Sequence, residues 1–370
     1  MPKILLVANA DSPLLVDRVQ MSAEGPHEVV WYSESAQKPV SDCRVYHYRK
    51  LLPLGPLNKL CATFFFLYVY WRERPDILHI HWALFLPLVL RRRWKNLIVS
   101  VMGSDVNLPG RFGSRRFFAR LAFARAVAIT SKSASMDQAI QRLQGKTARI
   151  RRFTWGVGEE FFSAKQRRNQ VLDSFGIARD AMVFFSPRAM QALYRIPDIV
   201  SSFLAFAAEQ PNAYLILAGM NPAPAVRAEI DAMLASSELA GRVLRLEQLD
   251  KSGMVDCYAA ADVVISYARQ DGMPQSLYEA MAVGCFPIFT NLPCYHELLI
   301  QQENALLCDN DEPQSILRMF ELYRDHYYGD RVQQVVSVNR NTIQQLATRT
   351  VEQKRLWALY DELLEKGHKP

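Results

Sequence analysis

The segment Val263-Val-Ile-Ser-Tyr-Ala-Arg-Gln-Asp-Gly-Met-Pro-Gln-Ser-Leu-Tyr-Glu-Ala-Met-Ala-Val-Gly284 carries the clearest structural pattern in the chain. The apolar run Val263–Ser266 leads into a polar loop, and a helical pattern begins at Gln275, directly after Gly272-Met-Pro274. A strand followed at once by a helix is the repeating unit of parallel sheets that carry helices on both faces. This segment therefore predicts an α/β fold.

The same alternation of short apolar runs and helical stretches extends through the rest of the chain. Its 370 residues suit two domains, each of roughly 150–200 residues. The glycines of Phe153-Thr-Trp-Gly-Val-Gly-Glu-Glu160 mark a linker. We predict two doubly wound, Rossmann-like domains at residues 1–157 and 158–350, and a final helix at 351–370. The expected strands are 3–8, 28–31, 44–47, 76–80, 97–101, 126–129 and 148–152 in the first domain, and 182–185, 213–218, 243–246, 262–266, 286–290 and 305–308 in the second.

Several nucleotide-binding designs are excluded by the glycine pattern. A dinucleotide enzyme of this class usually carries G-x-G-x-x-G directly after its first strand, but the chain reads Ala8-Asn-Ala-Asp-Ser-Pro-Leu14 there. Neither a phosphate-binding G-x-x-x-x-G-K-[ST] loop nor a G-x-S-x-G nucleophile elbow occurs. A nucleotide site, if present, therefore has a different design.

The loop and helix around Gly272 offer such a design. Free backbone N–H groups and the positive end of the helix dipole at Gln275 suit a diphosphate. Glu279 lies one turn inside the helix, where its carboxylate can accept hydrogen bonds from two vicinal hydroxyls, as on a ribose. Asp271 stands on the other side of the loop and could hold sugar hydroxyls. Taken alone, the two acids could equally be a helix cap and a solvated helix residue.

A longer stretch carries a family resemblance. Residues 258–288, from Tyr-Ala-Ala-Ala-Asp-Val-Val-Ile-Ser to Ala-Met-Ala-Val-Gly-Cys-Phe-Pro-Ile, resemble the signature of family-four glycosyltransferases, the retaining GT-B enzymes. That signature has two acidic residues with seven between them, then Ala-Met-Ala-x-Gly-x-Pro. Further segments match the family's landmarks: Ser186-Pro-Arg188, Asp76-Ile-Leu-His-Ile-His-Trp82, Ser104-Asp105, His296-Glu-Leu-Leu299 and Glu303-Asn-Ala-Leu-Leu307.

The resemblance implies a fold and roles for individual residues. The fold would be GT-B, two Rossmann-like domains facing a central cleft, with a C-terminal helix that returns to the first domain. Glu279 would bind the donor ribose, Asp271 a hydroxyl of the donor sugar, and Arg188 and Arg195 the charge of the leaving diphosphate. The backbone that meets the sugar and diphosphate would be that of Gly272, Met273, Pro274, Gln275, Ser276 and Leu277.

Three departures from the family pattern affect the residues of the site. Asp271 stands where the family usually has glutamate, so the carboxylate is one methylene shorter. Met102-Gly103 replaces the family's His-Gly, which removes an imidazole. Arg195 lies seven residues after Arg188 and is followed by Ile196-Pro197 rather than glycine.

The first domain contributes two further candidates for catalysis. His79 and His81 are two residues apart on an expected strand, so they share one face of it. His81 ends the strand and is expected to reach the cleft, whereas His79 is expected to be a hydrogen-bonded core histidine. Asp105 follows the strand at 97–101 and is expected to open on the cleft as well.

Charge divides unevenly along the chain and points to an anionic partner. Residues 1–155 contain 24 Lys and Arg against 10 Asp and Glu, while the remainder contains 20 against 27. A basic half favours an anionic acceptor or an anionic lipid surface; nucleic acid is not expected, because no binding motif accompanies the charge. The basic side chains that stand near aromatic ones are Arg91-Arg-Arg-Trp-Lys95, Arg49-Lys50, Lys59, Arg111 and Arg115-Arg116. A solvated basic face is the alternative.

The expected location is the cytoplasm, and peripheral attachment to the inner face of the membrane is the second option. The start of the chain lacks the pattern of a secretory signal, and the six cysteines lack metal-ligand spacing. The longest apolar run, Leu60–Trp71, is 12 residues, too short to span a bilayer. We expect a buried core helix there; a membrane-dipping helix is the alternative.

These observations predict a retaining glycosyltransferase that moves a sugar from a nucleoside-diphosphate sugar to a hydroxyl of a glycan or lipid-linked saccharide, in polysaccharide or glycoconjugate biosynthesis. Neither a cofactor nor a metal is expected, because arginines and a helix terminus would replace a cation at the diphosphate. Two alternatives stay open. One is another GT-B enzyme, such as a sugar-nucleotide epimerase or phosphorylase, and the other is a non-catalytic sugar-binding scaffold.

Overall fold

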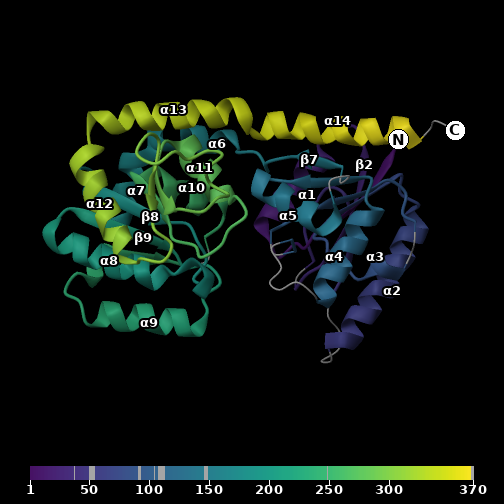
Figure 1. Cartoon of the computed structure of the whole chain (residues 1–370), viewed down its shortest axis with the longest axis horizontal. Coiled ribbons are helices and arrows are strands. Elements are labelled where there is room, and N and C mark those ends of the chain that lie inside the picture. Colours follow the sequence, from purple (N-terminus) through teal and green to yellow (C-terminus); the bar gives the residue numbers. More distant parts are fainter. Residues whose placement is uncertain are drawn as a thin grey trace. The chain divides into compact units, whose positions relative to one another are not determined.

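The computed structural model describes residues 1–36, 38–49, 55–90, 93–103, 105–106, 113–145, 149–247 and 249–367. The chain divides into two compact units (Figure 1). The first comprises Met1–Trp155 together with Thr350–Pro370, and the second comprises Gly156–Arg349. Each unit has its own parallel sheet and its own core.

The sheet of the first unit contains, among the described residues, seven parallel strands in the order β3-β2-β1-β4-β5-β6-β7. The order reverses between β1 and β4, which are hydrogen-bonded neighbours. The strands are β1 (Lys3–Val7), β2 (Glu28–Glu34), β3 (Arg44–Tyr48), β4 (Ile77–His81), β5 (Leu97–Ser100), β6 (Ala128–Ser131) and β7 (Ile150–Arg152).

Helices cover both faces of this sheet, because its central strands are apolar on both sides. On one face, α1 and α14 pack on alternate residues such as Ile4, Ile77 and Ile98. On the other face, α2, α4 and α5 pack on the intervening residues, such as Leu5 and Leu78. The helices of this unit are α1 (Pro13–Ala23), α2 (Gly55–Glu73), α3 (Pro87–Leu90), α4 (Ser114–Arg125), α5 (Ala134–Gln144) and α14 (Arg349–Gly367).

The sheet of the second unit contains, in the part of the chain that the structure describes, six parallel strands in the order β10-β9-β8-β11-β12-β13. Here the order reverses between β8 and β11. The strands are β8 (Met182–Ser186), β9 (Ala213–Ala218), β10 (Val243–Leu246), β11 (Val263–Ser266), β12 (Phe286–Thr290) and β13 (Leu306–Cys308).

The second unit repeats the three-layer arrangement. One face of its sheet packs on α6, α7, α10, α11 and the carboxyl end of α13, and the other packs on α8, α9 and α12. Its α-helices are α6 (Glu159–Ser163), α7 (Arg168–Phe175), α8 (Ile196–Glu209), α9 (Pro224–Ala235), α10 (Lys251–Ala260), α11 (Gln275–Val283), α12 (Gln314–His326) and α13 (Asp330–Leu346), and short 3-10 helices span Ala164–Arg167, Ala192–Tyr194 and Ala240–Arg242.

The predicted architecture of two doubly wound parallel sheets is confirmed. Every expected strand is present, and the ends differ by at most three residues. The predicted return of the C-terminal helix to the first unit is also confirmed. On α14, Leu356, Leu359 and Tyr360 are buried against Ile4, Ile77 and neighbouring residues of the first sheet.

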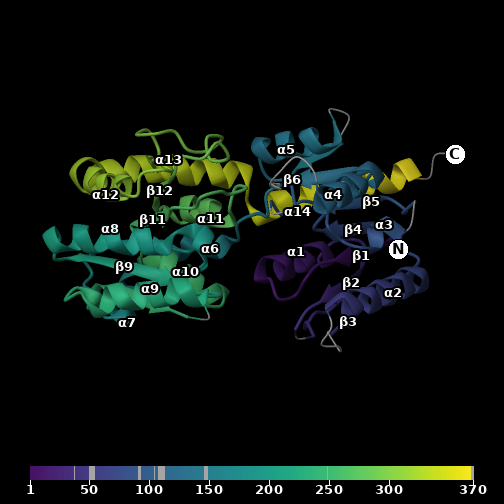
Figure 2. The ribbon, with the colours of Figure 1, turned by 60° about the horizontal axis from the view of Figure 1, so that its bottom comes forward.

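The helix over the long apolar run corrects one expectation. Within α2, Phe66, Val69 and Tyr70 are buried as expected, and the helix lies beside β3 (Figure 2). The opposite face is exposed, however, and Phe64 and Trp71 are 61% and 67% accessible. The run is therefore only half buried, because it supplies apolar residues to the outer face of the helix as well. The exposed apolar residues of α2 are Leu57, Leu60, Cys61, Phe64, Tyr68 and Trp71.

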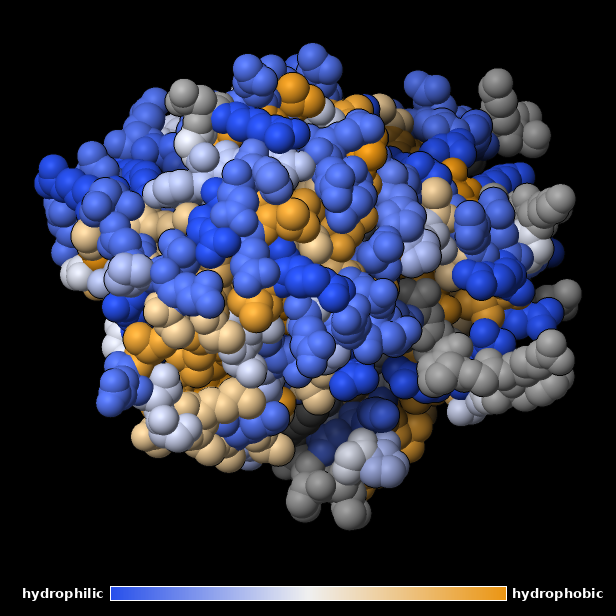
Figure 3. Space-filling view, turned by 60° about the vertical axis from the view of Figure 1, so that its left-hand side comes forward, coloured by the Kyte–Doolittle hydropathy of each residue, from blue (hydrophilic) through white to orange (hydrophobic). Residues whose placement is uncertain are grey.

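Figure 3 shows a largely hydrophilic face on which hydrophobic side chains gather only in limited areas. None of the helices, over the residues that the structure describes, is both long and apolar enough to span a membrane.

Candidate functional site

Two loops meet where the strand order of the second unit reverses. One follows β8 and carries Ser186-Pro-Arg188; the other follows β11 and runs from Tyr267 to Pro274. Because all strands are parallel, both loops lie at the carboxyl edge of the sheet. Doubly wound sheets bind their ligands at this edge, beside the strands where the order reverses.

Arg188 and Asp271 form a buried ion pair between these loops. Nη2 of Arg188 lies 2.8 Å from Oδ2 of Asp271, and its Nη1 donates a hydrogen bond of 3.3 Å to the Ser276 hydroxyl. Its Cζ lies 4.1 Å from the ring centroid of Tyr194. Burial opposes the guanidinium charge, but Asp271 and Tyr194 outweigh it and raise the pKa of Arg188. The site therefore holds a fixed positive charge where water screens little.

The Asp271 carboxylate is oriented by two further donors. Its Oδ1 accepts from the backbone N–H of Gly272 at 2.8 Å, and its Oδ2 accepts from the Tyr295 hydroxyl at 2.9 Å. Burial raises the pKa of Tyr295 well above its usual value, so this phenol remains a donor. The next residue, Met273, adopts a left-handed backbone with φ 66°, a conformation that side-chain-bearing residues hold mainly at functional sites.

The amino terminus of α11 begins directly after this turn. Pro274 precedes the helix, and no side chain caps its first N–H groups. The Gln275 side chain points the other way and donates to the carbonyl of Gly156 at 2.8 Å. Ser276 is held by Arg188, as described above. An uncapped helix terminus beside a buried arginine is an anion site of the kind expected for a diphosphate.

Glu279 stands one turn further along α11 and is half-buried. Its Oε2 accepts from the Tyr258 hydroxyl at 2.9 Å. Burial raises the pKa of Tyr258 well above its usual value, which keeps the phenol protonated. The carboxylate is thus held on the same helix as the predicted diphosphate site, at the position predicted for a ribose contact.

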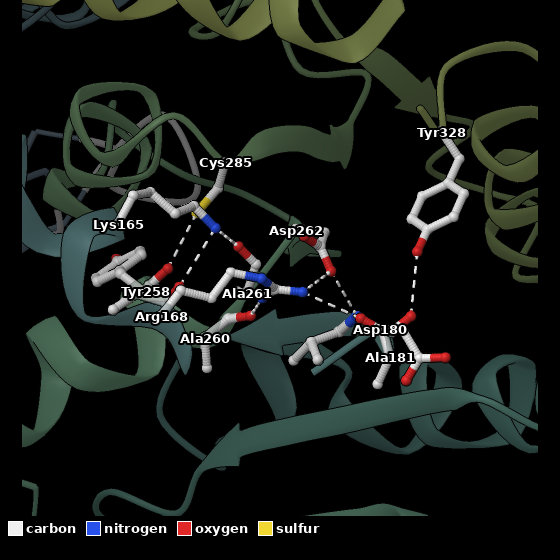
Figure 4. Close-up of polar contacts among 12 residues, drawn as sticks. Lys165, Arg168, Asp180, Ala181, Tyr258, Ala260, Ala261, Asp262, Cys285 and Tyr328 are labelled. Atoms are coloured by element: carbon white, nitrogen blue, oxygen red, sulfur yellow. Dashed lines mark hydrogen bonds and ion pairs between the residues drawn. The ribbon is translucent and has the colours of Figure 1, made fainter. Parts of the chain in front are cut away.

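Tyr258 belongs to α10, and the carboxyl end of that helix is held by two basic side chains (Figure 4). Lys165 donates to the carbonyls of Ala259 and Ala261, and Arg168 donates to that of Ala260. Arg168 also pairs with Asp262 at 3.0 Å. Two cations at the carboxyl end of a helix neutralise its free carbonyls and its dipole. This network therefore anchors the helix that carries the Glu279 partner.

Arg195 lies at the start of α8, and its guanidinium contacts both the loop after β13 and the first residue of the loop after β11. Nη1 and Nη2 donate to the backbone carbonyl and the side chain of Asn310 at 2.7 and 2.8 Å. Nε donates to the carbonyl of Tyr267 at 3.1 Å. The structure thus brings Arg188, Asp271 and Ser276 together, whereas Arg195 joins the start of α8 to the loops after β11 and β13. Its predicted contact with a diphosphate stays a prediction.

In the first unit, His79 and His81 share one face of β4, and their rings stack with centroids 4.5 Å apart. His79 is fully buried and hydrogen-bonded at both nitrogens, to the hydroxyls of Tyr360 and Ser100 at 2.7 Å each. It is the satisfied core histidine that the sequence predicts. His81 Nδ1 lies 3.3 Å from the carbonyl of Val7, while its Nε2 has no partner among the described residues.

Asp105 lies in the interior, which corrects the expectation that it opens outward. Its carboxylate is fully buried and accepts from the backbone N–H groups of Ala83, Met102 and Gly103 at 2.8–3.0 Å. Burial raises its pKa despite these hydrogen bonds. The geometry supports a role in positioning the loops after β4 and β5.

Sequence reasoning missed the supporting residues Tyr258, Tyr295, Tyr194 and Asn310. Tyr258 lies within the segment that resembles the family, but its distance from Glu279 along the sequence does not predict a contact between the two side chains. The chain also contains an Asp309-Asn-Asp311 triplet after β13, and its central residue binds Arg195. Of the basic and loop residues singled out above, Lys50, Arg91, Arg92, Ser104 and Arg111 lie outside the described residues.

The fold defines a class of protein, two-domain α/β proteins with a doubly wound parallel sheet in each domain. In the second domain a buried arginine lies beside an uncapped helix terminus at the carboxyl edge of the sheet. Residues 172–324 match the family model described as glycosyl transferases group 1. The stretch includes Arg188, Asp271 and Glu279, so the predicted family resemblance is confirmed over this part of the second unit.

Solved structures match the chain over nearly its whole length. Sucrose-phosphate synthase from Thermosynechococcus elongatus has a TM-score of 0.83 at 15% identity, covering 99% of this chain and 100% of that one. Anabaena Alr3699/HepE in complex with UDP and glucose gives 0.78 at 14%, covering 98% and 100%. WaaG, a glycosyltransferase involved in lipopolysaccharide biosynthesis, gives 0.76 at 12%, covering 95% and 98%. At these identities the likeness concerns the fold, and it confirms the predicted GT-B class. No curated protein sequence matches the chain significantly.

Proposed function

We propose that the protein is a retaining glycosyltransferase that moves a sugar from a nucleoside-diphosphate sugar to a hydroxyl of a glycan or lipid-linked acceptor. The observation that carries the proposal is the cluster of Arg188, Asp271 and Ser276 at the uncapped start of α11, with Glu279 one turn away. The diphosphate would lie on the helix terminus, the ribose on Glu279 and the sugar beside Asp271. The acceptor would bind to the first unit.

The chemistry follows from the charge at this cluster. When the bond between the anomeric carbon and the diphosphate oxygen breaks, its electron pair remains on the diphosphate. Arg188 and the helix terminus stabilise that charge most in the transition state, which lowers the barrier. The acceptor oxygen bonds to the anomeric carbon on the same face, and its proton passes to the departing diphosphate. The proposed reaction uses no protein nucleophile, metal or cofactor.

Product analysis tests this proposal. UDP-glucose is the first donor to try, because the Anabaena relative was solved with UDP and glucose; GDP- and ADP-sugars complete the panel. We expect nucleoside diphosphate release that depends on an added saccharide, with the anomeric configuration retained by NMR. Conversion of the donor without an acceptor would indicate an epimerase. Absence of both binding and turnover with every donor would leave a non-catalytic scaffold.

We further propose that the first unit docks on an anionic lipid surface through α2. The exposed apolar face of α2 (Leu57, Leu60, Phe64, Tyr68 and Trp71) follows helical spacing and lies opposite the core. The only acid of the helix, Glu73, is buried and paired with Lys3, while Lys59 and Arg72 are exposed. Aromatic side chains between basic ones suit a bilayer interface with anionic headgroups. The membrane contact predicted from the sequence rests mainly on basic side chains, and the exposed face of α2 supplies apolar side chains for the same contact.

Vesicle flotation tests this docking surface. We expect the protein to float with vesicles that contain phosphatidylglycerol and the doubly substituted Phe64→Asp/Trp71→Asp protein to stay in solution. Both side chains are exposed, so the melting temperature should not change. Equal flotation of the two proteins would contradict the proposal, and binding to neutral vesicles alone would exclude the electrostatic part.

A further inference from the structure

A small polar pocket opens at the carboxyl edge of the first unit's sheet, far along the chain from the donor-site residues. It lies at the ends of β4, β5 and β6, on the edge of the sheet at which doubly wound folds bind ligands. The cavity measures about 10 Å³, which is room for one oxygen-sized group. Its polar lining comes from α1 and from the ends of β4, β5 and β6: Arg18, His81, Ser100, Thr130, Ser131 and Lys132.

Arg18 is a buried cation that forms no ion pair with a carboxylate of the described residues. Its side chain is 3% exposed, and its protein contacts are the Met21 sulfur at 4.0 Å and the Phe153 ring at 5.8 Å from Cζ. Burial lowers the pKa of Arg18, and the charges of Glu352 and Asp17, which lie beyond ion-pair distance, offset that effect only in part; Glu352 itself pairs with Arg355 at 2.7 Å. Buried charges in proteins are normally paired, because leaving one unpaired is costly. A buried guanidinium without an ion pair at the wall of a polar pocket therefore suits an anionic ligand.

His81 adds an unused hydrogen-bond acceptor to the same pocket. Since Nδ1 faces the Val7 carbonyl at 3.3 Å, it must carry the proton and donate. The lone pair of Nε2 is then free and buried, with no partner in the described residues. Burial, together with the nearby Arg18, lowers the pKa of His81 to about 3, so the ring is neutral. Nε2 can therefore accept a hydrogen bond from a ligand O–H.

Lys132 supplies a second cation at the rim. Its Nζ lies 4.0 Å from the centroid of the Trp155 ring, and the side chain is half-buried. The hydroxyls of Ser100 and Thr130, by contrast, bond to each other at 2.6 Å, and Ser100 also bonds to His79. Two groups of the pocket can therefore bind a ligand directly: the guanidinium of Arg18 as a cationic donor and Nε2 of His81 as a hydrogen-bond acceptor.

We propose that this pocket is an anion subsite for the acceptor. An oxygen of a phosphate monoester or a carboxylate would enter between Arg18 and Lys132, and a hydroxyl of the same molecule would donate to His81 Nε2. The rest of the molecule remains outside, because the cavity admits only one oxygen. The inference rests on the proposed glycosyl transfer and narrows its acceptor to a hydroxylated anion, a sugar phosphate or a sugar acid.

Calorimetric titration distinguishes the two sources of the anion. The probes are inorganic phosphate, glucose 6-phosphate and glucuronate, with neutral glucose as the control. We expect glucose 6-phosphate or glucuronate to bind the wild-type chain, and glucose to give no signal. Arg18→Met should weaken that binding at least tenfold, and His81→Gln and Lys132→Gln should weaken it less. Arg142→Met, at an exposed arginine of α5 in the same unit, should leave it unchanged.

Thermal unfolding separates a binding role from a structural one. Because Arg18 is buried without an ion pair, Arg18→Met should melt at the same temperature as the wild type or higher. Failure of all three anions to bind the wild type overturns the subsite, as does binding by Arg18→Met at wild-type strength, which would mark an adventitious ion only. If Arg18→Met fails to fold, unchanged affinity in both His81→Gln and Lys132→Gln overturns it.

Donor titrations on the same proteins keep the two proposals apart. Arg18→Met should bind nucleoside-diphosphate sugars as the wild type does. If anions bind through Arg18 but no donor binds, the anion subsite stands and the proposed glycosyl transfer fails. If donors bind and no anion does, the transfer stands and the subsite fails.

Discussion

At the scale of single residues, the account depends on the guanidinium of Arg188, which pairs with Asp271 and also reaches Ser276. Lysine would keep the charge but not the planar fork that contacts several oxygens at once. We expect Arg188→Lys to lower kcat by about 10²–10³-fold, the range for removing one transition-state donor, with a smaller change in KM.

The matched control is Arg179→Lys, because Arg179 pairs with Asp173 at 2.7 Å on the exposed surface of the same unit. Steady-state kinetics of both variants with one donor and one acceptor provide the measurement. A kcat for Arg188→Lys within threefold of wild type would show that this guanidinium does not stabilise the leaving group.

Residues of the candidate site differ in how far sequence could predict them. Asp271 and Glu279 belong to one short segment whose strand, loop and helix fix their spacing, so they could be found. Tyr295 could not, because its hydroxyl reaches Asp271 from a separate loop. Arg18 resembles a surface arginine on an amphipathic helix; only the fold reveals that it is buried without an ion pair.

At the scale of elements, the carboxyl end of α2 is joined to the sheet by Glu73. Its buried carboxylate accepts from Tyr46 at 2.6 Å, Lys3 at 2.9 Å and Arg44 at 3.1 Å. Burial alone would raise its pKa, but these donors lower the pKa of Glu73 from 4.5 to about 2. The folded state thus binds this proton more weakly than the unfolded chain.

A lowered folded pKa makes stability depend on pH in one direction. Glu73 should stabilise the fold by up to about 3 kcal/mol above pH 4.5, and this contribution should be lost as the pH falls toward 2. We expect Glu73→Gln to be less stable at pH 7 and to lose that part of the acid dependence, measured by urea unfolding from pH 2 to 7. Glu312→Gln, at an exposed pair with Arg318, is the control. Parallel pH profiles for wild type and Glu73→Gln would refute this assignment.

The central strands were predictable because they are short apolar runs between breaks, and buried parallel strands have few other patterns. The edge strands β3 and β7 are more polar. Which face of α2 is buried and which is exposed could not be predicted in the same way. Phe64-Phe-Phe-Leu-Tyr68 is apolar without interruption, so its sequence gives no period that separates Phe66, which is buried, from Phe64, which is exposed. The environment of the helix decides which face is covered.

At the scale of the whole molecule, each unit has its own core, and α14 belongs to the first. Tyr360 of α14 is fully buried and bonds to His79, whereas Tyr323 of α12 is buried in the second unit. Differential scanning calorimetry should therefore resolve two transitions. Tyr360→Ala should lower only one of them, by about 10 °C, and Tyr323→Ala only the other. A common shift of both transitions in either variant would show that the cores do not unfold separately.

The central claim is that Glu279 and the start of α11 bind a nucleoside-diphosphate sugar, and calorimetric titration of Glu279→Gln tests it most directly. The amide keeps the size of the side chain but loses the charge that strengthens hydrogen bonds to hydroxyls. With the donor that binds the wild type best, we predict a Kd at least tenfold weaker for Glu279→Gln, an unchanged circular dichroism spectrum, and wild-type affinity for Glu229→Gln on the exposed face of α9. Wild-type affinity in Glu279→Gln would contradict the account.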